Sequence, residues 1–276
     1  MDALRRQLGD KVVIQTTPVS AHRRIWLNNR IKPFSDVRVR RALSLAIDRY
    51  AMSRVLYPVK GLKLIAGRMR PGSEWEMSGA EFQRYPGSGE EADKNRAEAR
   101  RLLTEAGYPN GVTVKSIHTT LTGMQTLLQA VQAQLKKSNI NLDIEEVEHA
   151  TYHAQIRKDL SPLVHYQAAR FPVADVYLTQ FYDSASIVGT PTAVTNFSHC
   201  NVADAEIRAA RTETDPAKQK ELWKTAQEKI IKAVCGIPVY EQLQLWAWKD
   251  TLDLGYDLKG SLNLAPPVTE KTHFTK

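Results

Sequence analysis

The apolar residues of this chain recur at three- and four-residue intervals in several long stretches, a spacing typical of amphipathic helices. Longer helices are expected over Asp36–Leu56, Asp93–Ala106, Met124–Lys137 and Pro216–Val234, and a short one near Tyr152–Lys158. Ser35 is the expected cap of the first helix and Gly107 ends the second, while Asp215 precedes a proline at the start of the last. The region from 58 to 89 is rich in Gly, Pro and Ser and is expected to form loops.

Short apolar or alternating runs predict strands between the helices. They lie at Val112–Ile117, Leu142–Val147, Leu163–Ala168 and Ile237–Trp248, with edge strands expected at Val12–Ile14 and Ile25–Leu27. The region 112–147 reads as strand, helix and strand, a βαβ unit with parallel strands and a right-handed crossover. The strand at Leu163–Ala168 is expected to extend this unit. The alternation of helices and strands predicts an α/β fold.

Composition places the chain among ordinary globular proteins. Its 276 residues are 42% hydrophobic and 25% charged, and this length allows one large or two small domains. No apolar run reaches the roughly 18–20 residues that span a bilayer. The first ten residues, MDALRRQLGD, have no apolar core and are therefore not expected to be a secretory signal peptide.

The net charge of +8 raises a second class of function, a basic cytoplasmic α/β protein that binds nucleic acid. The basic residues are spread along the chain, however, and no zinc-finger, RNP or basic-zipper signature accompanies them. The densest group, Arg38, Arg40 and Arg41, interrupts no apolar position of its helix, which indicates a solvated basic surface. We therefore expect no nucleic acid among the partners.

The two cysteines, Cys200 and Cys235, are too few for a disulfide scaffold and lack the spacing of a metal site. They can pair if the protein is exported, because an oxidising compartment permits a disulfide. Two unrelated thiols are the interpretation that the sequence favours.

The chain contains no GxSxG nucleophile elbow, no HExxH zinc motif and no phosphate-binding glycine loop. His149 and His153 are four residues apart and can share a helical face, which makes them a possible metal pair. No nearby cysteine or third histidine completes a site, so we assign neither a metal nor another cofactor. Because no residue set supports a nucleophile or an acid–base pair, we expect no enzymatic activity.

Three motifs follow one another along the chain in a fixed order. PFSDVRVRRALSLAID runs from Pro33 to Asp48 after the strand Ile25–Asn29, EAGYPNG follows at Glu105–Gly111, and IPVY stands at Ile237–Tyr240. In wording and order they resemble family 5 of the extracellular solute-binding proteins of ABC importers, the peptide/nickel/opine-binding type. The resemblance extends from about Ile25 to Trp248.

This resemblance implies an α/β fold that is the second lobe of a class II periplasmic-binding-protein-like fold, a mixed sheet flanked by helices. In the family a whole first lobe precedes the PFxDxRVRxA motif, whereas about thirty residues precede it here. The chain is therefore expected to be the C-terminal portion of a larger protein. Residues 1–30 would be a remnant of the first lobe and the hinge strand, 31–245 the second lobe, and 246–276 the segment returning to the first lobe.

The function that the resemblance implies is that of the solute-binding component of an ABC import system. A small-molecule solute would lie in the cleft between two lobes, and the partners would be the missing N-terminal lobe and an ABC permease in the membrane. The full-length form would be periplasmic, or extracellular and lipid-anchored. Its signal peptide would have been lost with the first lobe.

The expected solute-binding residues lie where the strand at Leu163–Ala168 turns into the next helix, because ligands of open α/β sheets bind beyond the carboxyl ends of strands. They are Arg170, Phe171, Tyr166 and Gln167. The alternative for Arg170 is an ion pair with Asp175, which is itself expected to cap the helix. Trp246 and Trp248 share one face of their strand, and for them the core is a more common place than a ligand site.

Peptide-binding relatives carry the pattern WxADYxDPxxFL here, whose first Asp holds the α-ammonium group of the ligand. With Tyr177-Leu178 aligned to the final FL, Arg170 takes the place of that Asp and Gln167 that of the Trp. A guanidinium about 4 Å from an ammonium costs about 4 kcal/mol at an effective dielectric near 20, roughly a thousandfold in affinity. The expected solute is therefore anionic, opine- or sugar-acid-like, rather than a free-amine peptide. An oligopeptide or a nickel complex is the alternative within the family.

Overall fold

A computed structural model describes residues 2–52, 54, 62–63, 69, 73–83, 85, 87–89, 91–169, 173–190, 195–258 and 267–275. The strands are β1 Val12–Leu27, β2 Leu62–Lys63, β3 Val112–Thr119, β4 Ile140–Val147, β5 Leu163–Ala169, β6 Ile237–Lys249, β7 Leu252–Asp253 and β8 His273–Phe274. The α-helices are α1 Asp2–Leu8, α2 Val37–Ala46, α4 Gly79–Gln83, α5 Ala92–Glu105, α6 Thr122–Lys136, α7 His149–Arg157, α8 Ala174–Tyr182, α9 Asp204–Thr212 and α10 Pro216–Lys232. Two short 3₁₀ turns lie at Gly9–Lys11 and Ser184–Ser186.

The central sheet has the strand order β2-β6-β1-β5, and all of its neighbouring strands are antiparallel. One of its two inner strands is β1, a single strand of 16 residues. The sequence predicted two short edge strands here, and this prediction was wrong. Ile25, Trp26 and Leu27 are buried because other strands flank β1 and helices cover both faces of the sheet.

The predicted βαβ unit is confirmed, with β3 and β4 parallel and α6 between them. The strand β5, however, does not extend this unit by backbone pairing. It pairs with β1, antiparallel, from Leu163 opposite Leu27 to Ala169 opposite Ala21. Serine hydroxyls connect β3 to this region instead: Ser116 Oγ donates to the carbonyl of Leu163, and Ser161 Oγ accepts from the amide of Ile117, both at 3.1 Å.

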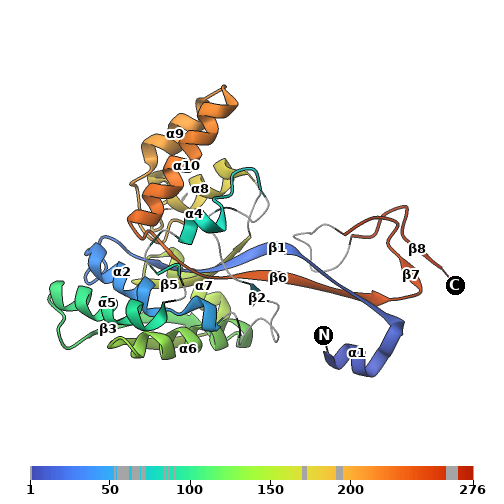
Figure 1. The fold of residues 1–276 in the computed structure, drawn as a ribbon, viewed down its shortest axis with the longest axis horizontal. Coiled ribbons are helices and arrows are strands. Elements are labelled where there is room, and N and C mark those ends of the chain that lie inside the picture. Colours follow the sequence, from blue (N-terminus) through green and yellow to red (C-terminus); the bar gives the residue numbers. More distant parts are fainter. Residues whose placement is uncertain are drawn as a thin grey trace.

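Two apolar cores lie on opposite sides of the central sheet. The helices α2, α5 and α6 pack on one side, and α8, α9 and α10 on the other (Figure 1). Trp26 belongs to the second core, where its ring stacks on Phe181 with centroids 5.5 Å apart. Burial of both faces of the sheet is the main source of stability in such a layered lobe.

The helix α2 begins and ends differently from the sequence prediction. Its cap is Asp36 rather than Ser35, because the Asp36 carboxylate accepts from the amide of Arg38 at 2.8 Å. It ends at Ala46, and a separate helical segment follows from Arg49, where the Asp48 carboxylate accepts from the amide of Ala51. The apolar stripe predicted for this region is buried throughout.

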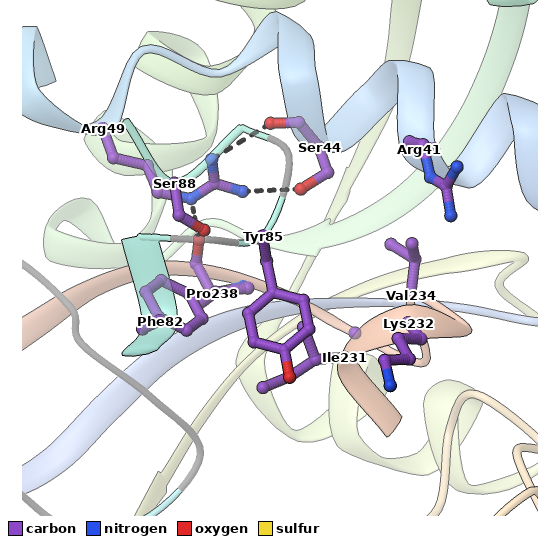
Figure 2. A pocket seen from close by; sticks show the side chains of 11 residues that line it. Arg41, Ser44, Arg49, Phe82, Tyr85, Ser88, Ile231, Lys232, Val234 and Pro238 are labelled. Carbon is purple, nitrogen blue, oxygen red and sulfur yellow. Dashed lines mark hydrogen bonds between the residues drawn. The ribbon is translucent and has the colours of Figure 1, made fainter. Parts of the chain in front are cut away.

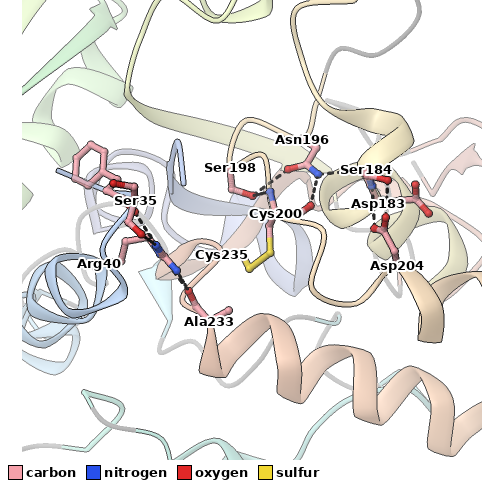
Figure 3. Close-up of a disulfide and its surroundings, with 11 residues drawn as sticks. Ser35, Arg40, Asp183, Ser184, Asn196, Ser198, Cys200, Asp204, Ala233 and Cys235 are labelled. Atoms are coloured by element: carbon pink, nitrogen blue, oxygen red, sulfur yellow. Dashed lines mark hydrogen bonds between the residues drawn. A yellow bond between two sulfur atoms is a disulfide. The ribbon is translucent and has the colours of Figure 1, made fainter. Parts of the chain in front are cut away.

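Arg40 corrects the prediction of a solvated basic surface on α2. Its side chain is buried, and its guanidinium donates to the carbonyls of Phe34 and Ala233 at 2.6 and 2.7 Å. The carbonyl of Ala233 lies just after α10, so Arg40 connects the end of that helix to the start of α2 (Figure 3).

The other predicted helix ends are confirmed. Gly107 follows α5 with a φ of 92°, a left-handed conformation that glycine adopts without steric cost. Asp215 caps α10 by accepting from the amides of Ala217 and Lys218 at 2.9 and 3.0 Å.

The structure joins Cys200 and Cys235 in a disulfide, so the preference for two unrelated thiols was wrong. Their Cα atoms are 5.7 Å apart although the residues are 35 positions apart in sequence. The bridge connects the segment before α9 to the turn after α10, beside Ser198 and Asn196 (Figure 3). Only the folded topology places the two sulfurs together, and spacing in the sequence could not show it.

Strands β1 and β6 continue past the helices as a two-stranded ribbon that leads to α1 and to the C-terminal segment (Figure 1). On this ribbon Trp246 is buried against Leu254 and Leu258, and its indole Nε1 donates to Thr17 Oγ1 at 2.8 Å. Trp248 packs at the border of the same small cluster. The two tryptophans thus have the packing role that the sequence favoured.

Among the helices in the described part of the chain, none is long and apolar enough to cross a membrane.

Candidate functional site

The predicted change from strand to helix is present between β5 and α8. Arg170 and Phe171 lie outside the described residues, so their predicted roles rest on the sequence. Tyr166 and Gln167 are described, and both are partly buried at the C-terminal end of β5. Two of the four residues predicted for the solute site thus lie within the described part of the chain.

Asp175 does not have the role predicted for it. The cap position of α8 is Val173, without a side-chain cap bond, and Asp175 lies within the first turn. Its carboxylate accepts from Thr179 Oγ1 at 2.8 Å and pairs with the Arg211 guanidinium at 3.1 Å. Asp175 is thus already paired with a cation from α9.

Tyr166 and Gln167 point to opposite faces of the sheet, because side chains alternate along a strand. The ring of Tyr166 lies near Phe197, His153 and Trp26, with centroids 5.2, 5.8 and 6.2 Å away. This places Tyr166 on the side of the second core. Gln167 shares its face with His165 and lies opposite Arg23 of β1.

His165, which shares a face of β5 with Gln167, forms a cluster of titratable side chains with His118 and Tyr152. The sequence did not predict this cluster. His165 is fully buried, and its ring is 5.1 Å from that of His118 on β3. The ring of Tyr152 from α7 lies 5.7 Å from His118, and its hydroxyl donates to the main-chain carbonyl of His165. The available signal was a histidine at the buried, alternate position of an otherwise apolar strand.

This environment keeps the two imidazoles uncharged at neutral pH. Burial lowers the pKa of His165 well below its usual 6.5, and repulsion from His118, when that ring is protonated, and from Arg23 lowers it further. Burial also lowers the pKa of His118, while the backbone of Met124 opposes the shift. Burial raises the pKa of Tyr152 far above its usual range, so its hydroxyl stays protonated. Arg23, itself buried, is the permanent cation beside these groups.

The possible metal pair lies on α7, next to this cluster. The rings of His149 and His153 are in T-shaped contact, with centroids 4.6 Å apart. In the described part of the chain, no three His, Cys, Asp or Glu side chains form a metal-binding group.

A separate pocket lies beside the edge of β6, between α2, α4 and α10 (Figure 2). Its buried Arg49 donates to the carbonyls of Pro238, Gly87 and Ser44 at 2.6, 2.8 and 3.0 Å. Pro238 lies in β6, Ser44 in α2 and Gly87 in a turn, so these bonds satisfy carbonyls from three separate elements. The guanidinium therefore connects β6, α2 and the turn at Gly87.

Comparison with known proteins identifies the family. Residues 2–189 match the description "Bacterial extracellular solute-binding proteins, family 5 Middle". The chain belongs to this family. The family 5 resemblance seen in the sequence is confirmed, and with it the prediction of a binding protein rather than an enzyme.

Among solved structures, this chain is similar to MoaA of A. tumefaciens R10 in complex with mannopinic acid, with 41% identity and a TM-score of 0.82. It is also similar in fold to DppA of Helicobacter pylori in complex with the peptide STSA, with 20% identity and a TM-score of 0.79. The two matches cover 100% and 99% of this chain, but 54% of MoaA and 51% of DppA. These likenesses confirm the predicted class of fold.

Among curated relatives, the glutathione-binding protein GsiB of Pectobacterium atrosepticum is 29% identical over 231 residues, which is 80% of this chain and 42% of GsiB. GsiB of Escherichia coli K12 is 28% identical over 236 residues. The chain thus spans about half the length of the relatives that it matches.

Proposed function

We propose that this chain forms one lobe of the solute-binding component of an ABC import system, and that its solute is a small anion of the opine or sugar-acid type. The observation that carries the proposal is the gradient of similarity. Identity is 41% with a protein solved with mannopinic acid, against 29% with a glutathione-binding protein and 20% with a peptide-binding one.

The side chains around Gln167 support an anionic solute. Arg23 is a buried guanidinium on the neighbouring strand, directly opposite Gln167. Arg170 follows β5 within three residues of Gln167 and offers a planar, bidentate donor to a carboxylate. A free peptide ammonium would be repelled by both charges, since like charges at a few ångströms in a site of low dielectric cost several kcal/mol.

The lobe boundaries form part of the same proposal. Residues 1–30 would contribute to the first lobe and the hinge strand, 31–245 would form the second lobe, and 246–276 would return to the first lobe. In the whole protein the lobes would close on the solute by hinge motion, and an ABC permease would receive it. The whole protein would act outside the cytoplasm, in the periplasm or anchored by lipid at the cell surface.

Glutathione is the second candidate, favoured by the similarity to the GsiB proteins. It carries two carboxylates and one ammonium, so its affinity shows whether a net negative charge on the solute is sufficient for binding. The distinction between the two solutes lies in the polyhydroxylated part of an opine, which a neutral hydrogen-bonding site would recognise.

The test is calorimetry on the two-lobed protein, in which this chain is joined to its complementing first lobe. We expect mannopinic acid to bind at least roughly tenfold more tightly than the peptide STSA. Arg170→Gln should weaken mannopinic acid binding by roughly tenfold to a hundredfold, because a charge-assisted hydrogen bond is lost. The control Arg208→Gln, on the exposed side of α9, should leave affinity unchanged.

A well-folded two-lobed protein that binds STSA tightly and mannopinic acid not at all would overturn the anionic assignment. Preference for glutathione over mannopinic acid would support the second candidate. The lobe alone presents one side of the cleft, and we expect it to bind every one of these solutes weakly.

A further inference from the structure

His149 and His153 occupy successive turns of α7 on one face of the helix. Their ring centroids are 4.6 Å apart and both side chains are partly exposed, so an ion from solvent can reach them. A metal held by two ring nitrogens at about 2.1 Å in tetrahedral geometry places the ring centroids about 5 Å apart. The observed centroid separation of 4.6 Å suits a two-point chelate once the rings, whose planes lie at 88° to each other, turn to direct one nitrogen each toward the ion.

Each ring is held in place by neighbours from other elements. The Nδ1 atom of His149 is 3.1 Å from the Oγ1 of Thr119, a fully buried residue that ends β3. This hydrogen bond leaves the Nε2 atom of His149 for a ligand, the arrangement usual for metal-binding histidines. The ring of His153 lies 5.8 Å from Tyr166 and 5.3 Å from Tyr152, which restrict its rotation.

The charge state of His153 also suits a cation. Burial lowers the pKa of His153, and the neighbouring His149 and Arg157 lower it further, so its imidazole is neutral at neutral pH. Metal ions bind the neutral imidazole and compete with protons for it.

We propose that His149 and His153 form a binding site for a divalent transition-metal ion such as Zn²⁺. Imidazole nitrogens suit Zn²⁺, Cu²⁺ and Ni²⁺ better than Ca²⁺ or Mg²⁺. Because no third His, Cys, Asp or Glu completes the group within the described residues, the remaining coordination positions belong to water or to an external donor. The ring contact and the Thr119 hydrogen bond support this proposal beyond the i,i+4 spacing of the two histidines.

The experiment is isothermal titration of the chain, freed of any affinity tag, with Zn²⁺ alone. We expect one saturable site per chain, lost in His149→Ala and in His153→Ala. Thr119→Ala should weaken binding by roughly tenfold, the usual effect of removing a residue that orients a ligand. Binding should also weaken as the pH falls and protons occupy the imidazoles.

The matched control is His273→Ala, which removes an exposed imidazole from β8 and should leave Zn²⁺ binding unchanged. Thermal unfolding followed by circular dichroism shows whether each variant is folded. The proposal is overturned if the parent chain shows no saturable binding, or if a folded variant that carries both His149→Ala and His153→Ala binds Zn²⁺ as the parent does. Since no solute enters the titration, either result leaves the proposed transport function untouched.

Discussion

Arg40 is a buried cation whose charge is balanced by main-chain carbonyls. It donates to carbonyls at both the start of α2 and the end of α10, and among the described residues no carboxylate forms an ion pair with it. Burial lowers its pKa to about 10, which still leaves it charged at neutral pH. Such a side chain stabilises the lobe because the carbonyls that it satisfies would otherwise be buried without donors.

We predict that Arg40→Met lowers the free energy of unfolding by about 2–4 kcal/mol, because two carbonyls lose their charged donor. The measurement is urea denaturation of the purified chain. Arg41→Met is the control, since Arg41 follows on the same helix, is partly exposed, and should change stability by no more than about 0.5 kcal/mol. Equal effects of the two substitutions would contradict this account.

His165 makes the stability of the lobe depend on pH. Its folded-state pKa lies well below 6.5, so below that pH the unfolded chain binds a proton that the folded chain does not. The stability that neutral His165 contributes is therefore complete above about pH 6.5 and is lost as the pH falls toward the folded-state pKa.

We predict that unfolding free energy falls between pH 7 and pH 5 by up to about 1.4 kcal/mol per pH unit for this one group. His165→Leu should reduce that slope, because an apolar side chain replaces the titrating ring. His273→Leu, at an exposed position, should keep the full slope. Chemical denaturation at a series of pH values measures all three, and an unchanged slope in His165→Leu would refute the prediction.

At the scale of elements, the disulfide and Arg40 fix the two ends of one turn. Cys235 and Ala233 both lie just after α10, where the chain turns into β6. One is bonded to the segment before α9 and the other to α2, so elements on both sides of the sheet hold this turn.

We predict that Cys200→Ala combined with Cys235→Ala costs about 2–4 kcal/mol, because the open chain gains conformational freedom when unfolded. Thermal unfolding with and without reductant provides the measurement. Dithiothreitol should lower the transition of the parent to near that of the double variant and leave the double variant unchanged. A parent chain that is insensitive to reductant would argue against the bridge.

At the scale of the molecule, residue spacing and helix capping predicted the features that neighbouring residues determine. The apolar stripes of α6 and α10, the glycine after α5 and the parallel pair of β3 and β4 followed from spacing and capping. The sheet order did not, because β1 pairs with β5 and β6, whose sequences lie far away. The same distance hid the disulfide and the contact of His118 with His165.

The pairing of β1 with β6 also has a consequence in time. Val12 pairs with Lys249, so β1 leaves the ribosome more than two hundred residues before its partner exists. At about 5–20 residues per second, this interval lasts roughly 10–50 s. During it a long strand has no lasting neighbour on that side and can pair with other chains. The central sheet can therefore assemble only after β6 has been synthesised. A chaperone that keeps the nascent chain unfolded until then would prevent β1 from pairing with other chains.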